Sequence, residues 1–356
     1  MEKFDIGILT FGDANTLPAK LYVDLQMKYF QNILMLSRAF GIRTAMFGLS
    51  DFQMENGEPV CSAMFWNGSD YVVERAVIPD IIDNVSSISN RWYAHISPEA
   101  AAWLRKQTPM HGRSLTKLEM YHALCQCGLS QFAIPTQEFS EYGELAAAMQ
   151  GREKAIVKPS YGREGQGVTY IDNTDAGLIY RNEDGEGLLT EEAWRSFRNR
   201  WQQYKKYLLQ ERMDFHTRDG RAMDFRLLVL KGDGGEWTIS STHAKLGATK
   251  YISNVWNGGS LGYTKQVLAF EFPDKAEEFW ETLNELGTLL PQVLERYCSD
   301  PVSSYGFDIG FDRQTERAYV IEANSFPGAV PPWPMAETRV RYYRYLLSQK
   351  KNNHHL

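Results

Sequence analysis

The sequence has few cysteines and no long apolar run. Its four cysteines, Cys61, Cys125, Cys127 and Cys298, are scattered, and one residue instead of two separates Cys125 from Cys127. This pattern provides neither a disulfide framework nor a C-x-x-C metal or redox motif, so we expect reduced, mostly buried thiols. The opening residues, MEKFDIGILTF, place an aspartate inside a short apolar run. That composition fits neither a signal peptide nor a membrane span, and we expect a cytoplasmic protein.

An excess of basic charge is also missing. The chain has 38 Lys and Arg against 44 Asp and Glu, a net charge of −6 and a pI near 5.7. This balance argues against a protein that tracks a nucleic-acid backbone, and we expect neither a nucleic acid nor a membrane as partner. A basic segment from Arg195 to Lys206 has two interpretations, a site for an anionic partner and a solvated helix face.

The usual glycine-rich phosphate loops are absent as well. Residues 155–171, AIVKPSYGREGQGVTYI, match neither G-x-x-x-x-G-K-[ST] nor G-x-G-x-x-G. The glycines instead lie between two strand-like flanks, which predicts a hairpin flap whose backbone amides can close over a polyphosphate. Lys158 ends the entering strand, where its ammonium can reach the same phosphates. An ordinary mobile loop is the alternative interpretation.

The length of 356 residues exceeds what one core normally supports, so we expect subdomains that share a cleft. An apolar strand at 6–11, a helical pattern at 19–40 and a strand at 43–49 predict a βαβ unit with a parallel sheet. We expect an N-terminal α/β domain over 1–112, a central subdomain with the flap over 113–213, and a C-terminal subdomain over 214–356. Ser114 is the expected cap of the first helix after the N-terminal domain.

Two carboxylates are predicted to face each other near the C-terminus. The segments YGFDIGF and AYVIEAN are separated by the polar turn DRQTER, so we expect a β-hairpin. A turn centred on residue 315 places Asp308 across from Glu322, and alternation puts Asn324 on the same face. The same alternation puts Tyr319, Ile321 and Ala323 on the opposite face.

Opposed like charges destabilise a hairpin unless something compensates them. A divalent cation does so economically, and two carboxylates with an amide oxygen suit magnesium. The alternative is a solvent-exposed face on which the charges only increase solubility. A magnesium hairpin and a glycine flap together favour a nucleotide site over two unrelated features.

Several ordered motifs resemble the ATP-grasp superfamily and, within it, the YheC/YheD-like endospore coat-associated branch. The resemblance runs from about Leu115 to Gly328 and rests on TKLEMYHALCQCG, VKPSYGREGQG, LLQERM, DFRLLVL, ISNVWNGGS and GFDIGFDRQTERAYVIEANSFPG. It implies an α/β fold with an N-terminal pre-ATP-grasp domain and two subdomains that clasp the nucleotide.

The resemblance also implies roles for individual residues. The phosphates of ATP would lie beside two lysines and the flap: Lys117, Lys158, Tyr161, Gly162, Gly165, Gln166 and Gly167. The adenine would contact a hinge strand: Gln210, Glu211 and Met213. Magnesium, as two ions, would be held by Asp308, Glu322 and Asn324.

Three further positions match the family pattern less closely. Arg226 is similar to the arginine that neutralises the transferred phosphoryl group, with a surface ion pair to Asp224 as the alternative. Lys245 stands where related sequences more often have an arginine, and it keeps the charge without the bidentate fork. Asn254, in the N…GG segment before Gly258-Gly259, would approach the acceptor substrate; a capped glycine turn is the alternative. We expect His243 to be structural.

The activity that the resemblance implies is ATP-dependent ligation of a carboxylate to an amine through an acyl phosphate. A kinase on the same fold and a nucleotide-binding structural protein of a spore coat are the alternatives. Phosphoryl transfer asks mainly for positioning and charge neutralisation, and lysines, one arginine, backbone amides and magnesium supply both. No residue identifies the carboxylate or the amine.

Overall fold

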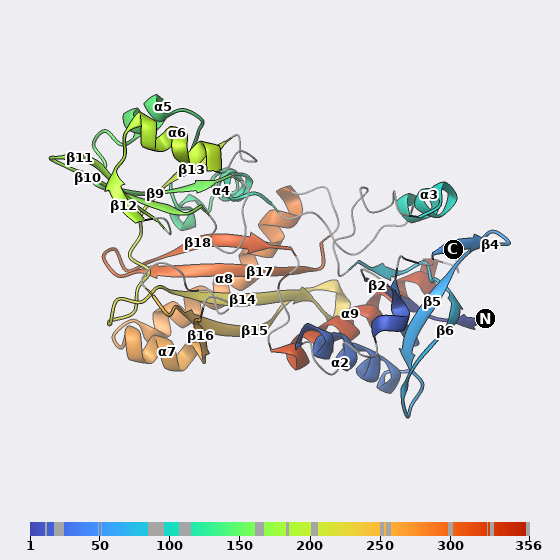
Figure 1. Ribbon diagram of the computed structural model, residues 1–356. Coiled ribbons are helices and arrows are strands. Elements are labelled where there is room, and N and C mark those ends of the chain that lie inside the picture. Colours follow the sequence, from blue (N-terminus) through green and yellow to red (C-terminus); the bar gives the residue numbers. More distant parts are fainter. Residues whose placement is uncertain are drawn as a thin grey trace.

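The computed structural model contains three β-sheets that follow one another along the chain (Figure 1). It describes residues 1–10, 13–17, 25–48, 50, 52–84, 96–106, 115–160, 167–182, 185–200, 206–249, 253, 258–297, 302–325, 327 and 331–353. The C-terminal sheet lies between the central sheet and the N-terminal sheet in this view.

The N-terminal sheet has the order β1-β6-β5-β3-β2-β7, with β4 on β5. Its β2 and β3 are parallel and joined through α2, so the predicted βαβ unit is present. The prediction of a parallel sheet was wrong for the sheet as a whole, because β5 pairs antiparallel with β3, β4 and β6 and the sheet is mixed. All five residues of β2 and of β3 are buried, as expected for strands covered on both faces. The elements are β1 (Glu2–Lys3), β2 (Ile6–Thr10), η1 (Ala14–Thr16), α2 (Leu25–Ala39), β3 (Thr44–Gly48), β4 (Gln53–Glu55), β5 (Glu58–Trp66), β6 (Tyr71–Val77), β7 (Ile82–Asp83) and α3 (Pro98–Lys106).

The central sheet has the order β12-β11-β10-β9-β13-β8, and α5 and α6 lie beside it (Figure 1). The strand that ends at Lys158 and Pro159 pairs with β10, so the glycine-rich segment does connect two antiparallel neighbours. The elements are α4 (Lys117–Gln126), η3 (Ser130–Phe132), β8 (Thr136–Phe139), α5 (Tyr142–Ala148), β9 (Lys154–Pro159), β10 (Thr169–Thr174), β11 (Gly177–Asn182), β12 (Gly185–Leu188), α6 (Glu191–Arg200) and β13 (Tyr207–Glu211).

The C-terminal sheet is antiparallel, with the order β16-β15-β14-β17-β18. One face packs on α8, where the rings of Phe279 and Phe311 stack with centroids 4.0 Å apart. The elements are β14 (Met223–Lys231), η4 (Asp233–Gly235), β15 (Trp237–Leu246), β16 (Ser260–Gly262), α7 (Thr264–Glu271), α8 (Ala276–Tyr297), β17 (Ser304–Asp312), β18 (Arg317–Asn324) and α9 (Pro332–Asn353).

The helix α4 differs from expectation in its cap and its cysteines. Thr116 is the N-cap: its Oγ1 accepts from Glu119 N at 3.1 Å, and Glu119 Oε2 accepts from Thr116 N at 2.8 Å. The predicted cap, Ser114, lies outside the described residues. Cys125 and Cys127 are exposed, so the expectation that they are buried was wrong.

The exposure of the two cysteines follows from which face α4 buries. Met120, Ala123 and Leu124 enter the core of the C-terminal sheet, and the cysteines lie off that face. The predicted domain bounds assign this helix to the central subdomain. These bounds remain a prediction. The buried residues of α4 nevertheless pack in the core of the C-terminal sheet, outside the predicted C-terminal bounds.

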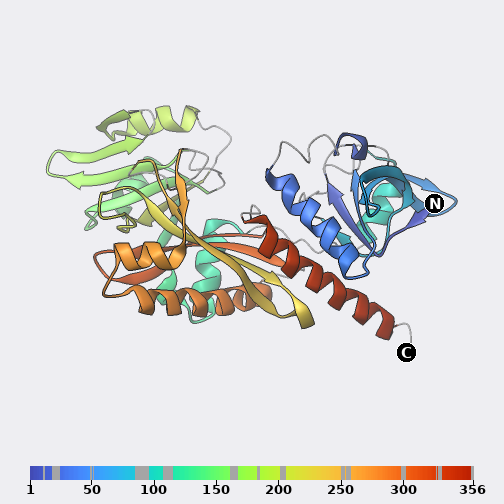
Figure 2. The same cartoon turned by 90° about the horizontal axis from the view of Figure 1, so that it is seen from below.

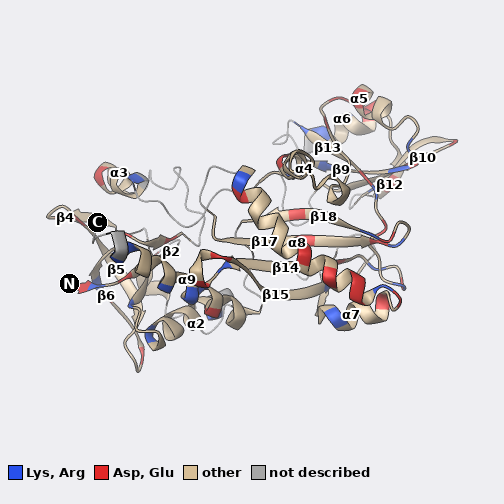
Figure 3. Cartoon of the chain, turned by 180° about the vertical axis from the view of Figure 1, so that it is seen from behind, with Lys and Arg blue, Asp and Glu red and all other residues tan. Residues whose placement is uncertain are grey.

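Acidic side chains gather along α8, as Figure 3 shows. Glu277, Glu278, Glu281 and Glu285 are exposed there, while Phe279, Leu283 and Leu286 face the core. No helix among the described residues is long and apolar enough to cross a membrane.

The last helix, α9, packs between the N-terminal domain and the C-terminal sheet. It runs beside α2 of the N-terminal domain (Figure 2), and Leu228 and Leu230 of β14 share a hydrophobic cluster with Met335 and Val340 of α9. The C-terminal sheet is therefore covered on its second face, at this end, by α9. The rest of that face is where the predicted site residues lie.

A buried ion pair lies inside this contact. Arg339 is 2 % exposed, and its Nε lies 3.5 Å from Asp83 Oδ2 of β7. Tyr343 donates to the same carboxylate at 2.6 Å, and Ser303 accepts from Arg339 Nη1 at 2.5 Å. Burial by itself would lower the pKa of Arg339, but Asp83 and the nearby tyrosines outweigh it and raise that pKa, so the guanidinium keeps its charge.

Replacing Arg339 with leucine is therefore expected to destabilise the whole chain. Asp83 would remain buried without its cation, which typically costs about 3–5 kcal/mol. Urea unfolding followed by circular dichroism measures the change. The matched control is Arg344→Leu on the same helix, whose partner Asp233 is exposed; such pairs contribute about 0–1 kcal/mol. Equal losses for the two variants would contradict a role for the Arg339–Asp83 pair.

A charged candidate nucleotide site on the C-terminal sheet

The predicted carboxylate pair is present on the hairpin of β17 and β18. Asp308 lies directly across from Glu322, and Gly306 lies across from Asn324. Asp308 is 5 % exposed, whereas the Glu322 side chain is 34 % exposed. The alternative of a fully solvated face does not hold for Asp308.

The hairpin also contains a β-bulge that the sequence did not reveal. The register shifts between Asp308 and Ile309, so that Ile309 pairs with Val320 and Ile321 is the extra residue. Ile321 therefore packs with Tyr319 in a small cluster beside the hinge, while Ala323 enters the main core. The predicted placement on the face opposite Glu322 is correct for Ala323 but wrong for Tyr319 and Ile321, because the bulge reverses the alternation.

Two cations from the neighbouring strands neutralise Asp308. Arg226 is its direct neighbour on β14 and binds it with two nitrogens, Nη2 lying 2.9 Å from Oδ2. Lys245 Nζ on β15 lies 3.0 Å from Asp308 Oδ2 and 2.7 Å from Asp224 Oδ1. A surface pair of Arg226 with Asp224 is thus not what the structure shows: the carboxylate bound to Arg226 is Asp308, and the pair is largely buried.

Glycine at position 306 makes room for this arginine. A Cβ there would lie 2.6 Å from Pro327 Cβ and 3.0 Å from Arg226 Nη1. A larger residue at this position would displace either the proline or the guanidinium. Gly306 thus leaves the space that the Arg226 side chain occupies.

The pKa values of the two buried aspartates shift in opposite directions. Burial alone would raise the pKa of Asp308, but Arg226 and Lys245 outweigh it and lower that pKa to about 2. Burial raises the pKa of Asp224, and Lys245 and Ser253 only partly oppose it. Asp308 is therefore the firmly ionised member. Sequence reasoning missed Asp224, although its position two residues before Arg226 on one strand signals a shared face.

The two predicted nucleotide lysines, Lys117 and Lys158, both lie near Glu322. Lys117 Nζ lies 3.4 Å from Glu322 Oε1, and Lys158 at the end of β9 is 8 % exposed. Burial and the charge of Lys117 together lower the pKa of Lys158 to about 7, although Glu322 opposes both. Lys117 and Lys158 therefore repel each other, and an arriving anion would relieve this repulsion.

The hinge strand β13 leads into a small apolar cluster. Ile134, Met213 and Tyr319 are its buried members, and Phe215 and Ile321 pack against them. The side chain of Gln210 is buried and donates from Nε2 to Thr136 Oγ1 at 2.7 Å, while Glu211 is exposed. The cluster provides apolar surface next to the end of the hinge strand.

Some predicted residues cannot be placed. Tyr161, Gly162, Gly165, Gln166 and Asn254 lie outside the described residues. Gly167 and Gly258 are described, with φ of 69° and 83°, values that favour glycine. The roles predicted for all these residues remain predictions.

His243 was expected to be structural, but it lies on the same face as the charged set. It is the cross-strand neighbour of Arg226, and its Nδ1 has no hydrogen-bond partner among the described residues. Burial lowers the pKa of His243 to about 4, and Arg226 and Lys245 add to this effect. A neutral imidazole with a free nitrogen therefore faces the site.

The residues present fit magnesium by donor type. Asp308, Glu322 and Asn324 offer oxygen ligands from one face of one hairpin, which is the chemistry that magnesium prefers. Among the described residues no group of three or more His, Cys, Asp or Glu is placed to hold a metal. The predicted set contains two carboxylates and an amide, so any ion there would complete its shell with phosphate or water.

A family model described as YheC/D like ATP-grasp matches residues 108–348. This range covers more than half of the chain, and the chain belongs to that family. Arg226, Lys245, Asp308, Glu322 and Asn324 all lie within it.

Individual relatives agree with this membership. The endospore coat-associated protein YheD of Bacillus subtilis (strain 168) is 28 % identical over 205 residues, which are 55 % of this chain and 44 % of that protein. The matched region thus spans less than half of the length of YheD.

Solved structures show the fold. D-alanyl-alanine synthetase A from Vibrio cholerae superimposes with a TM-score of 0.55 at 14 % identity, covering 99 % of this chain and 98 % of the other. The ATP-grasp ligase PsnB, in complex with a variant of its minimal precursor, Mg and ADP, gives a TM-score of 0.52 at 13 % identity, covering 95 % and 99 %.

The state of His243 predicts a pH dependence of stability. Its folded pKa of about 4 lies below the ordinary 6.5, so the unfolded chain binds the proton first as the pH falls. Stability linked to His243 is therefore present above pH 6.5 and is lost toward pH 4, amounting to on the order of 2 kcal/mol by pH 4.5. The difference in unfolding free energy between wild type and His243→Gln should change by this amount between pH 7 and 4.5. The control is the same replacement at His122, which is exposed and lies outside the charged set. An equal change in both variants would contradict the role of His243.

Proposed function

We propose that this chain is a magnesium- and ATP-dependent ligase that joins a carboxylate to an amine through an acyl phosphate. The observation that carries the proposal is the grouping of Arg226, Lys245, Lys117 and Lys158 around Asp308 and Glu322. The family membership and the ligases among its structural neighbours support an ATP-dependent enzyme in general.

The arrangement suits phosphoryl transfer because it supplies charge without a nucleophile. Lys117 and Lys158 would neutralise the nucleotide phosphates, and Arg226 and Lys245 would neutralise the group in transit. Asp308, Glu322 and Asn324 would hold magnesium, which when bound supplies charge neutralisation between phosphate oxygens. Ile134, Met213 and Tyr319 would form the wall against which the adenine lies.

The reaction has two balanced steps. A substrate carboxylate oxygen bonds to the γ-phosphorus and ADP leaves, which gives an acyl phosphate. An amine nitrogen then bonds to the acyl carbon, phosphate leaves and the amine loses a proton. In this mechanism Arg226 would stabilise the negative charge that develops in both steps.

A second candidate follows from the relative YheD, whose name links that protein to the endospore coat. On this hypothesis the chain is a nucleotide-binding structural protein associated with a spore. The buried balance of Arg226, Lys245 and Asp308 speaks for the enzyme, because a scaffold gains little from a desolvated ion cluster.

The metal assignment is tested by calorimetry of ATP binding with and without magnesium. Wild type is expected to bind more tightly with the metal, and the double variant Asp308→Asn/Glu322→Gln is expected to show no difference, because two of the oxygen ligands lose their charge. The control variant Glu278→Gln/Glu316→Gln removes the same charge at exposed positions and should behave as wild type. An unchanged magnesium effect in the first variant would disprove the assignment.

The acyl phosphate is tested by trapping with hydroxylamine. With ATP, magnesium and pools of amino acids or short peptides as carboxylates, a ligase forms a hydroxamate and releases phosphate. A kinase instead forms a stable phosphoester without free phosphate. Replacing Arg226 with lysine should lower hydroxamate formation by about 10²- to 10³-fold, since one charge remains but the bidentate contact is lost. Equal rates in the two proteins would remove Arg226 from the mechanism.

A further inference from the structure

Polar side chains line one face of β15 along its whole length. Lys245 and His243 lie on the face that carries Asp308, since they pair across from Asp224 and Arg226. Farther along, Ser241 pairs across from Leu228, and Thr238 from Leu230. On β14 this face changes from charged residues to leucines that α9 covers, whereas on β15 it stays polar.

A second β-bulge adds one more hydroxyl to this row. The register of β14 and β15 shifts between Leu228 and Val229, which leaves Ser240 as the extra residue. Ser240 Oγ lies 3.3 Å from Thr338 Oγ1 of α9, so Ser240 also faces that helix. The buried Oγ of Ser241 has no hydrogen-bond partner among the described residues. We call Lys245, His243, Ser241, Ser240 and Thr238 the polar row.

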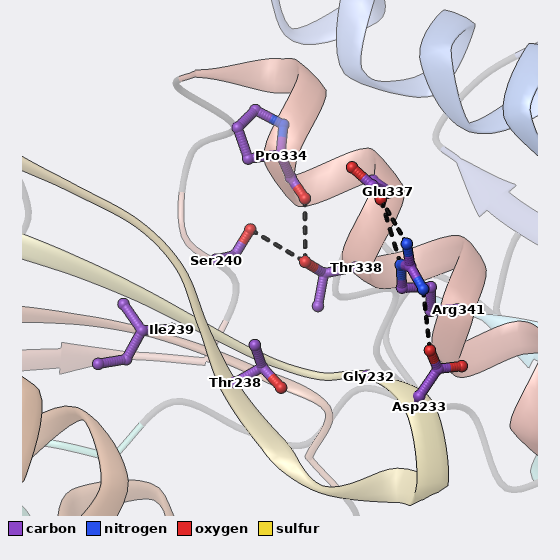
Figure 4. Close-up of a pocket in the computed structure, with 9 residues that line it drawn as sticks. All are labelled: Gly232, Asp233, Thr238, Ile239, Ser240, Pro334, Glu337, Thr338 and Arg341. Atoms are coloured by element: carbon purple, nitrogen blue, oxygen red, sulfur yellow. Dashed lines mark hydrogen bonds and ion pairs between the residues drawn. The ribbon is translucent and has the colours of Figure 1, made fainter.

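The polar row ends in a cavity of about 350 Å³ between β15, the turn at 232–235 and α9. Figure 4 shows the hydroxyls of Thr238, Ser240 and Thr338 on its walls, with Ile239 pointing away from them. Arg341 lies at the other side, bound to Glu337 at 2.7 Å and to Asp233 at 3.0 Å. The cavity wall thus combines hydroxyl groups with side chains of positive and of negative charge.

The edge of β15 is open beside this row. The neighbouring strand β16 pairs only with Ala244, Lys245 and Leu246. From Trp237 to His243, no strand among the described residues pairs with that edge. An unpaired edge presents backbone N–H and C=O groups, which suit an extended polypeptide.

We propose that an extended peptide binds along the open edge of β15, with one residue in the cavity at Thr338 and one end at the charged site near Arg226. The proposal rests on the proposed function, and it names the substrate as a peptide. Seven residue steps separate Thr238 from Lys245, a span of about 20 Å, which an extended segment of about six residues covers.

The chemistry of the open edge and of the polar row favours a peptide over a single small metabolite. Backbone pairing with the edge supplies affinity for any extended chain, and the serine and threonine hydroxyls accept or donate to polar side chains. The cavity, with Glu337 and Arg341 on its wall, selects a polar residue at the distal position. A free amino acid would reach either the cavity or Arg226, but not both.

Hydrogen–deuterium exchange tests this binding directly and without nucleotide. The probe is a pool of unblocked hexapeptides randomised at every position. We expect it to slow exchange of the β15 amides between Thr238 and His243 that point to the open edge by at least fivefold in the wild type, since the alternate amides already bond to β14. In Thr338→Trp, where the indole fills the cavity, this protection should fall below twofold.

The control is Thr288→Trp on α8. Thr288 is exposed, and its Oγ1 bonds to the carbonyl four residues earlier, as that of Thr338 does. This variant should keep the full protection. Thr238→Trp, at an exposed position of the cavity wall, is a second blocking variant should Thr338→Trp fail to fold.

Two results would overturn the proposed peptide binding: no protection in wild type, or equal protection in wild type and both blocking variants. Magnesium-dependent ATP binding is measured separately on the same proteins. Protection by peptides without any ATP binding would support peptide binding at β15 and contradict the proposed ligase. ATP binding without protection would support the nucleotide site and contradict peptide binding at β15.

Discussion

The candidate site depends on one constraint, which is that carboxylates needed together on one sheet must be held there against their own repulsion. Asp224 and Asp308 are both buried, and each is paired with a cation from a neighbouring strand. Desolvation of such a set is costly, and close geometry is what offsets the cost. The charge pairs therefore require the register of β14, β15 and β17. A slip of one residue in any of these strands would turn one partner to the opposite face of the sheet, which packs on α8.

Two bulges adapt the same sheet to its two tasks. At Ile321 the bulge supplies an apolar side chain to the hinge cluster while Glu322 stays across from Asp308. At Ser240 the bulge adds a hydroxyl beside α9 while Ile239 stays in the core. In both cases a strand places an extra residue on the functional face without disturbing the opposite, packed face.

Features with a local cause could be predicted from the sequence. Alternation within a hairpin is local, so Asp308 and Glu322 could be placed opposite each other, and the βαβ start follows from short apolar segments around one helix. The bulges could not be predicted, because the extra residue is accommodated only by the partner strand. The pair of Arg339 with Asp83 joins positions 256 residues apart, and the pairing of Lys245 with both aspartates depends on three strands at once. Exposure of Cys125 follows from which face of α4 meets α8, which no single helix reveals.

The charge count at the site suggests why the cluster is built with an excess of cations. Four cationic side chains, Lys117, Lys158, Arg226 and Lys245, surround three carboxylates, Asp224, Asp308 and Glu322. The surplus is concentrated at Lys158, whose pKa is already lowered to about 7 by burial and by Lys117. A bound triphosphate would offset this burial and repulsion and would hold Lys158 in its charged form. Nucleotide binding and lysine protonation would then reinforce each other, so that the site is electrostatically complete only with its ligand in place.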